Sequence, residues 1–402
     1  AMPVAFARLL SLLTELLGLA MLVGLLYFLL RRIGADEPRA PQRTKFPVVV
    51  LLFIIVTGFL AEGTRLAIVP AGSSWSSPMG WLISLALPDS PLLMQVFIRL
   101  HFFALLVFVA ALPFTFMRHL VASSQNVFYK RPGLQGAMTP ASLEADSIGA
   151  RTIKDFTWKQ LLESEACVSC GRCEENCPAS QAEKPLSPRK VMQDILSQME
   201  QSGRKGSGTQ TDGLPLLAEA ISEDEIWACT SCMACVTHCP VFIEPLDKII
   251  DLRRYQVMGE ARLPTEARPM IRDLELYGDV QGKGVAHRAD WALNREVPQL
   301  FQSPDQNASQ VEMLLWVGCS GAFHPRNQET SRAMVKILKA AGIRFAILGK
   351  EELCCGDPAR RLGDEILFQK LARANIDNFN RHQVKKIVTL CPHCLSTLKN
   401  EY

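Results

Sequence analysis

The first 120 residues of the chain contain no cysteine and few charged side chains, and residues 1–100 contain no histidine. Leu, Val, Phe, Ile and Ala dominate this part, whereas residues 121–402 hold all thirteen cysteines and most of the acidic and basic residues. A chain of 402 residues is long enough for two or three domains. The uneven composition predicts a membrane part, residues 1–120, followed by a soluble part.

A basic stripe with interleaved aromatic residues is also absent, and the formal net charge is only +3. Proteins that follow a phosphate backbone carry such stripes, so we expect no nucleic acid partner. Tight CxxC groups in a chain with a membrane segment favour metal ligation in a reducing compartment over disulfides. We expect the natural protein to continue beyond one or both ends, because the chain opens near an apolar run and stops eight residues after Cys394.

Three apolar runs are long enough to span a bilayer: residues 9–30, 48–69 and 92–117. Each is close to or above the roughly 20 residues that cross a hydrocarbon core. We expect the shorter apolar piece at 79–87 to lie at the interface. Lys and Arg are frequent in 31–45 and absent from 70–90. Because such residues collect in cytoplasmic loops, this predicts a multi-pass protein of the cell inner membrane with its cysteines facing the cytoplasm.

Two histidines of the third run are candidate haem ligands. His101 and His119 are eighteen residues apart, which in one continuous helix is five turns and a rise of about 27 Å. They would share a face and serve one haem near each leaflet. Ionisable groups inside a membrane are functional suspects. The alternative places His119 among the headgroups and pairs His101 with a polar neighbour, and residues 1–100 offer no histidine as a second ligand.

Two arginines, Arg65 and Arg99, lie near the outer ends of their apolar runs. Their guanidinium groups are candidates to bind haem propionates or a quinone carbonyl. The alternative is that they extend to the interface and pair with Glu62 or with lipid phosphate.

Eight cysteines form two copies of the pattern C-x2-C-x2-C-x3-C-P, in CVSCGRCEENCP and CTSCMACVTHCP. This spacing indicates cubane iron–sulfur clusters, because two-residue gaps let three thiolates of one loop reach three corners of a cube. In two-cluster ferredoxins the fourth cysteine ligates the other cluster. The two sets are therefore Cys167, Cys170, Cys173 and Cys239, and Cys229, Cys232, Cys235 and Cys177. Two zinc knuckles are the alternative, although zinc sites do not use this repeated spacing.

Strands and helices alternate after residue 310. The pattern predicts strands at 311–318, 343–349 and 385–390, with helices at 326–342 and 363–381 between them. This is a parallel α/β unit with right-handed crossovers. The remaining thiols follow the strand ends, where parallel strands form a ligand crevice: Cys319, Cys354, Cys355, Cys391 and Cys394. Five convergent thiols exceed what a zinc ion requires; a redox-active disulfide or a structural metal is the alternative.

Thirty-four residues separate Cys319 from the CCG at 354–356, and thirty-five separate Cys355 from Cys391, the first residue of the CPHC at 391–394. This pattern resembles the CCG domain of heterodisulfide reductase catalytic subunits and of glycolate and lactate oxidase iron–sulfur subunits. The resemblance implies a noncubane [4Fe-4S] cluster on the five cysteines. Those reductases carry two such motifs, and this sequence shows one. The membrane part resembles the haem b subunit of respiratory nitrate reductase, whose last helix carries two haem ligands at the same spacing.

The whole order of parts is similar to that of fused membrane oxidoreductases that link electron-transfer flavoprotein to menaquinone. The stretches TWKQLLESEACVSCGRCEENCPA, EIWACTSCMACVTHCP and CCGDPARRLG carry this likeness. It implies a quinone-linked enzyme with two cubanes, one noncubane cluster and one or two haem b groups, in which a partner subunit would supply missing haem ligands. Two alternatives stay open: a menaquinol-linked disulfide or heterodisulfide reductase, and an electron-relay subunit of a sulfur-metabolism complex.

The expected architecture is multidomain. An α-helical transmembrane bundle (1–120) and a linker (121–155) precede an α-helical two-[4Fe-4S] ferredoxin-like domain (156–258). A second linker (259–310) then leads to an α/β CCG domain with a parallel sheet (311–402).

Overall fold

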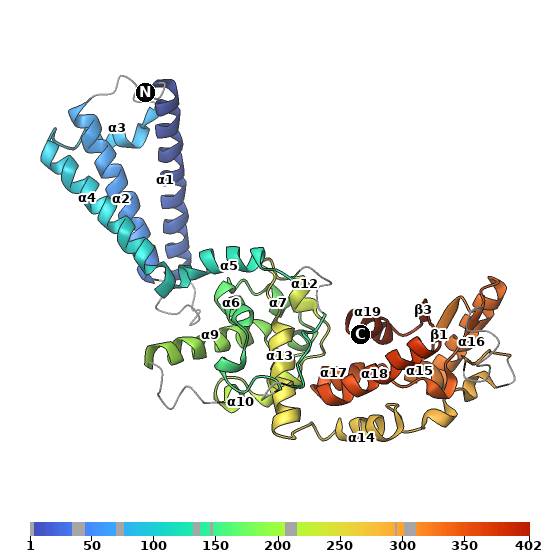
Figure 1. The fold of residues 1–402 in the computed structure, drawn as a ribbon. Coiled ribbons are helices and arrows are strands. Elements are labelled where there is room, and N and C mark those ends of the chain that lie inside the picture. Colours follow the sequence, from blue (N-terminus) through green and yellow to red (C-terminus); the bar gives the residue numbers. More distant parts are fainter. Residues whose placement is uncertain are drawn as a thin grey trace. The chain divides into compact units, whose positions relative to one another are not determined.

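The computed structural model describes residues 4–33, 45–69, 76–131, 137–144, 148–205, 215–293, 296–300 and 311–402. It divides into two compact units, Ala1–Ala122 and Ser123–Tyr402, which are taken separately (Figure 1). Most of the basic loop on which the predicted orientation rests falls in 34–44, outside the described residues.

Three long apolar helices form the first unit: α1 (Val4–Ile33), α2 (Lys45–Ile68) and α4 (Pro91–Ala111). Each contributes a stretch long and apolar enough to cross a membrane, namely Arg8–Leu30, Phe46–Ile68 and Pro91–Phe114. α2 packs against both α1 and α4 (Figure 1). Large apolar side chains such as Leu17 and Phe103 are exposed on the outer faces, which is the pattern of helices made to face lipid. The prediction of three spanning helices is confirmed at the level of length and composition.

The short apolar piece between the second and third long helices forms α3 (Pro78–Ser84), which packs against α1 and α2. The buried carboxylate of Glu15 on α1 accepts hydrogen bonds from the amides of Met79 and Gly80, both at 2.8 Å. These amides open a helix and have no acceptor within it. Glu15 therefore ties α3 to α1, and the location of α3 at a membrane interface stays a prediction.

The third long helix is shorter than the sequence suggested. α4 ends at Ala111, and the chain then forms 3-10 turns at Leu112–Phe114 and Phe116–Arg118 before α5 (His119–Phe128) begins. Thr115, between the two turns, is extended, with φ −120° and ψ 173°. Pro113 explains the break, because a proline ring removes one helical hydrogen bond and crowds the preceding turn. His101 and His119 do not share one continuous helix, so the prediction of a common face five turns apart is wrong.

The second unit starts with a helical part that surrounds the two CxxC repeats. Its main helices are α6 (Trp158–Ala166), α7 (Arg172–Glu175), α8 (Pro178–Gln181), α9 (Pro188–Lys205), α10 (Leu216–Glu219), α11 (Glu223–Trp227), α12 (Ala234–Thr237) and α13 (Pro245–Arg254). The core between them contains Val191, Ile195, Ile226 and Ile249, all fully buried. Thr157 and Ser222 begin α6 and α11 with capping boxes. α6 leads into the first motif, and α9 lies between the two motifs.

The C-terminal part contains the predicted parallel sheet. Its elements are β1 (Met313–Trp316), α15 (Gly318–Phe323), α16 (Pro325–Ala340), β2 (Phe345–Ala346), α17 (Asp357–Leu362), α18 (Glu365–Arg381), β3 (Ile387–Thr389) and α19 (Pro392–Asn400). The strand order is β2-β1-β3, and both pairings are parallel, with Leu314 beside Ala346 and Ile387. The three strands and the two longer helices predicted from the sequence are confirmed, with shorter strands than expected.

Residues 259–310 were expected to be a linker, and the structure contradicts this for much of their length. The segment contains α14 (Arg268–Tyr277), and Leu274 and Leu300 are buried in one core with β1 and α18. Trp291 is buried in a second core with β1 and α16. Because these side chains supply core to the sheet, the C-terminal domain starts well before residue 311.

Candidate metal centres

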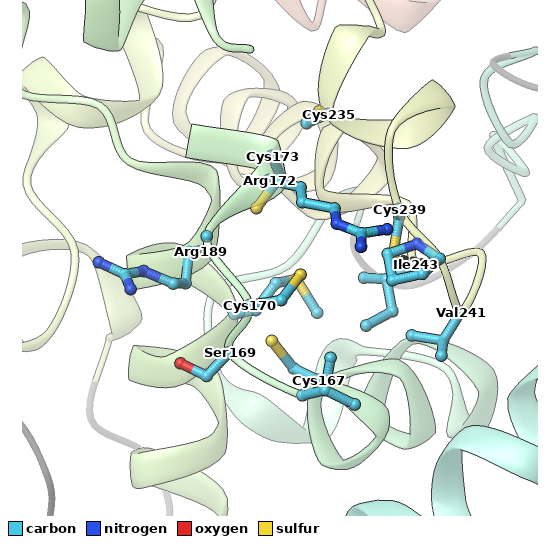
Figure 2. Close-up of a pocket in the computed structure, with 14 residues that line it drawn as sticks. Cys167, Ser169, Cys170, Arg172, Cys173, Arg189, Cys235, Cys239, Val241 and Ile243 are labelled. Atoms are coloured by element: carbon cyan, nitrogen blue, oxygen red, sulfur yellow. Dashed lines mark hydrogen bonds between the residues drawn. The ribbon is translucent and has the colours of Figure 1, made fainter. Parts of the chain in front are cut away.

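The first candidate centre is a pocket lined by the four thiols of the first set and by Cys235 of the second set (Figure 2). Cys167 follows α6, Cys170 and Cys173 bracket the start of α7, and Cys239 follows α12; all four line the same pocket. Among the described residues, no three His, Cys, Asp or Glu side chains converge closely enough for a single metal ion. Thiols placed around a space, as Figure 2 shows for these four, suit a cluster with several iron atoms better than one ion.

The thiols of this pocket influence one another. Burial raises the pKa of Cys173 to about 12, and the charges of Cys167, Cys239 and Cys170 contribute to this rise. The Cys173 thiol is therefore protonated at neutral pH, so its binding to iron must release a proton. The amide of Ile243 donates to Cys239 Sγ at 3.2 Å, and hydrogen bonds to sulfur tune the potential of a cluster.

The second set of thiols repeats the arrangement. The residues in front of α7 and α12, Gly171 and Met233, both adopt a left-handed backbone, with φ of 86° and 65°. Burial raises the pKa of Cys235, and the charges of Cys229, Cys173, Cys232 and Cys177 raise it further. The charges of Cys177 and Cys232 also contribute, beside burial, to the raised pKa of Cys229. The structure therefore brings Cys177, from the first motif, to the second set and Cys239, from the second motif, to the first.

The third candidate centre contains the remaining five thiols. They form one chain of sulfur contacts in the order Cys319, Cys354, Cys355, Cys394 and Cys391. Four of the five are buried, and Cys391 is half-buried. A hydrogen bond from the Cys394 thiol lowers the pKa of Cys391 to about 7. The convergence expected from the strand ends is present.

Two neighbours of this centre suit a bound cluster. The buried Trp316 indole directs its N–H toward the Cys394 sulfur, so this centre holds an N–H donor for sulfur. Gly318 has φ +73°, and a Cβ at this position would lie 3.0 Å from Cys394 Sγ and 4.0 Å from Trp316 Nε1. The residues present therefore fit a cluster whose sulfur atoms accept from the indole N–H and that lies close to the backbone at residue 318.

Two family models match the chain, and both agree with these centres. Residues 163–243 match a 4Fe-4S dicluster domain, and residues 313–399 match a cysteine-rich domain. "EtfAB:quinone oxidoreductase" of Syntrophomonas wolfei is 34% identical over 88% of this chain and 55% of its own length. "Probable iron-sulfur-binding oxidoreductase FadF" of Bacillus subtilis is 34% identical over 88% of this chain and 56% of its own length.

The chain belongs to this family of iron–sulfur oxidoreductases. It spans about half the length of these curated relatives. One subunit of the "Dihydromethanophenazine:CoB--CoM heterodisulfide reductase" of Methanosarcina barkeri is 28% identical over 62% of this chain and 60% of its own length. No solved structure matches the chain.

Two arginines connect the second thiol set of this iron–sulfur protein to the five-thiol centre, and sequence reasoning missed both. Arg253 on α13 donates to the carbonyl oxygens of Cys229 at 2.6 Å and of Arg361 at 2.8 Å. Arg361 on α17 donates to Ser231 O at 3.0 Å and to Asp357 Oδ1 at 2.8 Å. The amide of Asp357 in turn donates to Cys355. A continuous path of hydrogen bonds thus joins the loop of the second motif to the CCG motif.

The two histidines of the membrane unit, His101 and His119, are both held through Nδ1. His101 Nδ1 lies 2.9 Å from Ile54 O and 3.3 Å from Thr57 Oγ1 on α2, and His119 Nδ1 lies 2.6 Å from Phe116 O. Metal-ligating histidines are usually fixed in this way through one ring nitrogen, which leaves the other for the metal. The local geometry of each side chain fits ligation through Nε2.

The two candidate arginines of the membrane unit, Arg65 and Arg99, have partners within their own helices. Arg65 makes two hydrogen bonds to the Glu62 carboxylate, at 2.7 Å and 2.8 Å, which is the alternative weighed for it above. Arg99 lies 3.4 Å from Gln95 Oε1. Arg65 is therefore held by a close ion pair, whereas the contact that Arg99 makes within the described part of the chain is long, at 3.4 Å.

Proposed function

We propose that the protein carries electrons between a soluble flavoprotein of the electron-transfer flavoprotein type and menaquinone in the cell inner membrane. Its redox groups would be two [4Fe-4S] cubanes on the two crossed thiol sets, a noncubane [4Fe-4S] cluster on the five-thiol centre and haem b on His101 and His119. Such groups accept and release single electrons. The observation that carries the proposal is the convergence of all thirteen thiols into three sets within one compact unit.

The chain's own residues set the conditions for this transfer. Burial of the thiols lowers the local dielectric, and amide donors such as those of Ile243 and Ser231 stabilise charge on the sulfur atoms. The hydrogen-bonded path through Arg361 holds the second thiol set and the five-thiol centre in fixed register. The name of the S. wolfei relative supports the flavoprotein and the quinone as the two partners.

The membrane unit is proposed to be the quinone-reactive end. Three helices of spanning length support a multi-pass protein, and the excess of Lys and Arg in residues 31–45 supports a cytoplasmic location for the cysteines. Because residues 1–100 lack histidine, a further segment or a partner subunit would supply the second haem ligands. Arg99, with its weakly bound guanidinium, is the better of the two arginine candidates for a propionate or quinone oxygen.

The test is reduction of the purified protein by electron-transfer flavoprotein, supplied with electrons by an acyl-CoA dehydrogenase and its substrate. We expect the haem spectrum to change to the reduced form and to reoxidise on addition of a menaquinone analogue. A preparation without haem absorbance would refute the roles of His101 and His119. A haem-containing protein that the flavoprotein does not reduce would refute the proposed partner.

A disulfide reductase is the second candidate function. The half-buried Cys391, whose pKa is lowered to about 7, lies at the open end of the five-thiol centre, and the M. barkeri relative is named as part of a heterodisulfide reductase. Oxidation of the reduced protein by a disulfide substrate, together with no response to the flavoprotein, would favour this function over the first.

A further inference from the structure

One buried charge near the five-thiol centre comes from outside both matched family domains. Arg288 lies between residues 243 and 313, in a segment that neither family model covers. Its side chain is 1% exposed, and both terminal nitrogens lie 3.6 Å from Cys319 Sγ. An arginine is effectively always protonated in proteins, so a fixed positive charge faces this thiol.

Glu352 holds this guanidinium in place. Its Oε1 accepts from Arg288 at 3.0 Å and from the amide of Gly318 at 2.8 Å, and its Oε2 accepts from the amide of Val317 at 3.1 Å. The same carboxylate therefore binds the arginine and the backbone that leads into Cys319. Glu352 is also buried, so the pair has one orientation relative to the thiol.

Other residues of the segment that contains Arg288 make hydrogen bonds to Cys319 and Cys354. The amide of Val280 donates to Cys319, and the carbonyl of Gly278 accepts from the amide of Cys354 at 2.8 Å. Residues 278–288 thus supply one amide donor and one cation to a single thiol. The other buried arginines of the described residues, Arg253, Arg254 and Arg360, donate their hydrogen bonds to carbonyl or carboxylate oxygens and not to sulfur. The charge of Arg253 also acts on Cys229, although no hydrogen bond joins the two side chains among the described contacts.

We propose that Arg288 is a positioning residue that raises the reduction potential of the cluster held by Cys319 and the CCG and CPHC cysteines. This proposal rests on the proposed function, which places a redox cluster on these thiols. Reduction adds one negative charge to the cluster, and a nearby fixed cation stabilises the more negative state. Glu352 opposes this effect in part and sets the distance. A cation of this kind favours acceptance of an electron at the five-thiol centre.

The test is an EPR-monitored redox titration of the full chain, with iron content measured in parallel. In Arg288→Gln we expect the ratio of reduced to oxidised cluster at a fixed potential to fall at least tenfold, which is about 59 mV for one electron. Arg288→Lys keeps the charge. The logarithm of the same ratio should therefore fall by less than half of its fall in Arg288→Gln. Glu352→Gln removes the opposing charge and should change the ratio in the other direction.

Arg254→Gln is the matched control. Arg254 is a buried arginine paired with Glu365 at 2.9 Å, and it donates hydrogen bonds to oxygen atoms of Glu365, Asp251 and Thr139. Its loss should destabilise the fold and leave the potential unchanged. An intact cluster with an unchanged reduction potential in Arg288→Gln would reject the proposal. A shift of the potential in Arg254→Gln as large as that in Arg288→Gln would also reject it. Failure of both Arg288 variants to assemble the cluster would assign the residue to assembly and also reject it. Absence of the cluster signal in the unaltered protein would reject the proposed function instead.

Discussion

Glu163 provides the sharpest test of how the first thiol set is assembled. It lies on α6, four residues before Cys167, and its side chain is 2% exposed. Its carboxylate pairs with Lys248 of α13, receives a hydrogen bond from Lys159 at 2.7 Å and accepts from the amide of Glu244 at 3.1 Å. Glu244 follows Cys239 by five residues. The Glu163 carboxylate therefore links the segment before Cys167, the first ligand of the set, to the segment after Cys239, the fourth ligand.

Removing one partner of a buried ion pair costs about 3–5 kcal/mol, since the other charge is left without compensation. In Glu163→Gln, Lys248 would remain 1% exposed, with a 3.3 Å contact to Glu244 O and partial compensation by the charge of Asp247. The amide side chain still accepts from the Glu244 amide, so we expect the lower end, about 3 kcal/mol. At about 2–4 °C per kcal/mol, the melting temperature should fall by roughly 6–12 °C.

The assay is thermal unfolding of the detergent-purified protein by circular dichroism, with EPR of the cubanes. The signal of the first cubane should weaken before that of the second. Glu312→Gln is the control, because its ion pair with Arg344 is exposed (48% and 65%) and such pairs contribute about 1 kcal/mol or less. A melting temperature of Glu163→Gln within about 2 °C of the parent, with both cubane signals intact, would refute the reasoning.

Gly318→Ala should lose iron from the five-thiol centre while both cubane signals persist, because the new Cβ would lie 3.0 Å from Cys394 Sγ at φ +73°. Gly342→Ala, at φ +68° with no atom within 4 Å, has the same backbone strain and should keep its iron; equal loss in both would contradict the steric argument. Arg361→Met should keep all clusters and slow electron transfer between the second cubane and the five-thiol centre, followed by rapid-freeze EPR; an unchanged rate would remove Arg361 from the path. Asp247 has its pKa lowered because Lys248, Thr139 and Arg131 outweigh the effect of burial. Its contribution to stability is therefore complete above the unfolded pKa of about 3.9 and is lost at lower pH. The difference in melting temperature between the parent and Asp247→Asn should stay constant from about pH 8 to pH 5 and shrink below about pH 4; a decrease already near pH 6 would contradict this sign.

The sequence predicted the parts whose pattern is local. Two copies of one cysteine spacing were enough to group the thiols, and the apolar runs that became β1, β2 and β3 were bounded by polar helices. Periodicity reports burial directly, so these elements were found close to their true positions.

The wrong predictions concern features that hydropathy does not measure. Pro113 lies in an apolar run, so a count of apolar residues continues through it although the backbone cannot. Residues 259–310 are mostly polar, and their few core anchors, Leu274, Trp291 and Leu300, show no regular spacing. Arg288 and Glu352 are 64 residues apart, and no local pattern indicates that they meet.

The arginine contacts also assign an order to the two cubane sites within the second unit. Arg253 and Arg361 attach the loop of Cys229 and Ser231 to α17, which begins beside the CCG motif. At the other set, Ser123 Oγ donates to Ala166 O at 2.8 Å and Asn126 Nδ2 to Val241 O at 2.7 Å. These carbonyls lie next to Cys167 and two residues after Cys239.

Ser123 and Asn126 are on α5, along which the chain enters this unit. The thiol set that contains Cys229 is therefore hydrogen-bonded to the cysteine-rich domain. The set that contains Cys167 is hydrogen-bonded to α5, the first helix of this unit. Under the proposed function, electrons that start at the five-thiol centre must reach the Cys229 set first. Loss of the Cys229 set should then isolate the five-thiol centre, whereas loss of the Cys167 set should leave these two centres in mutual exchange.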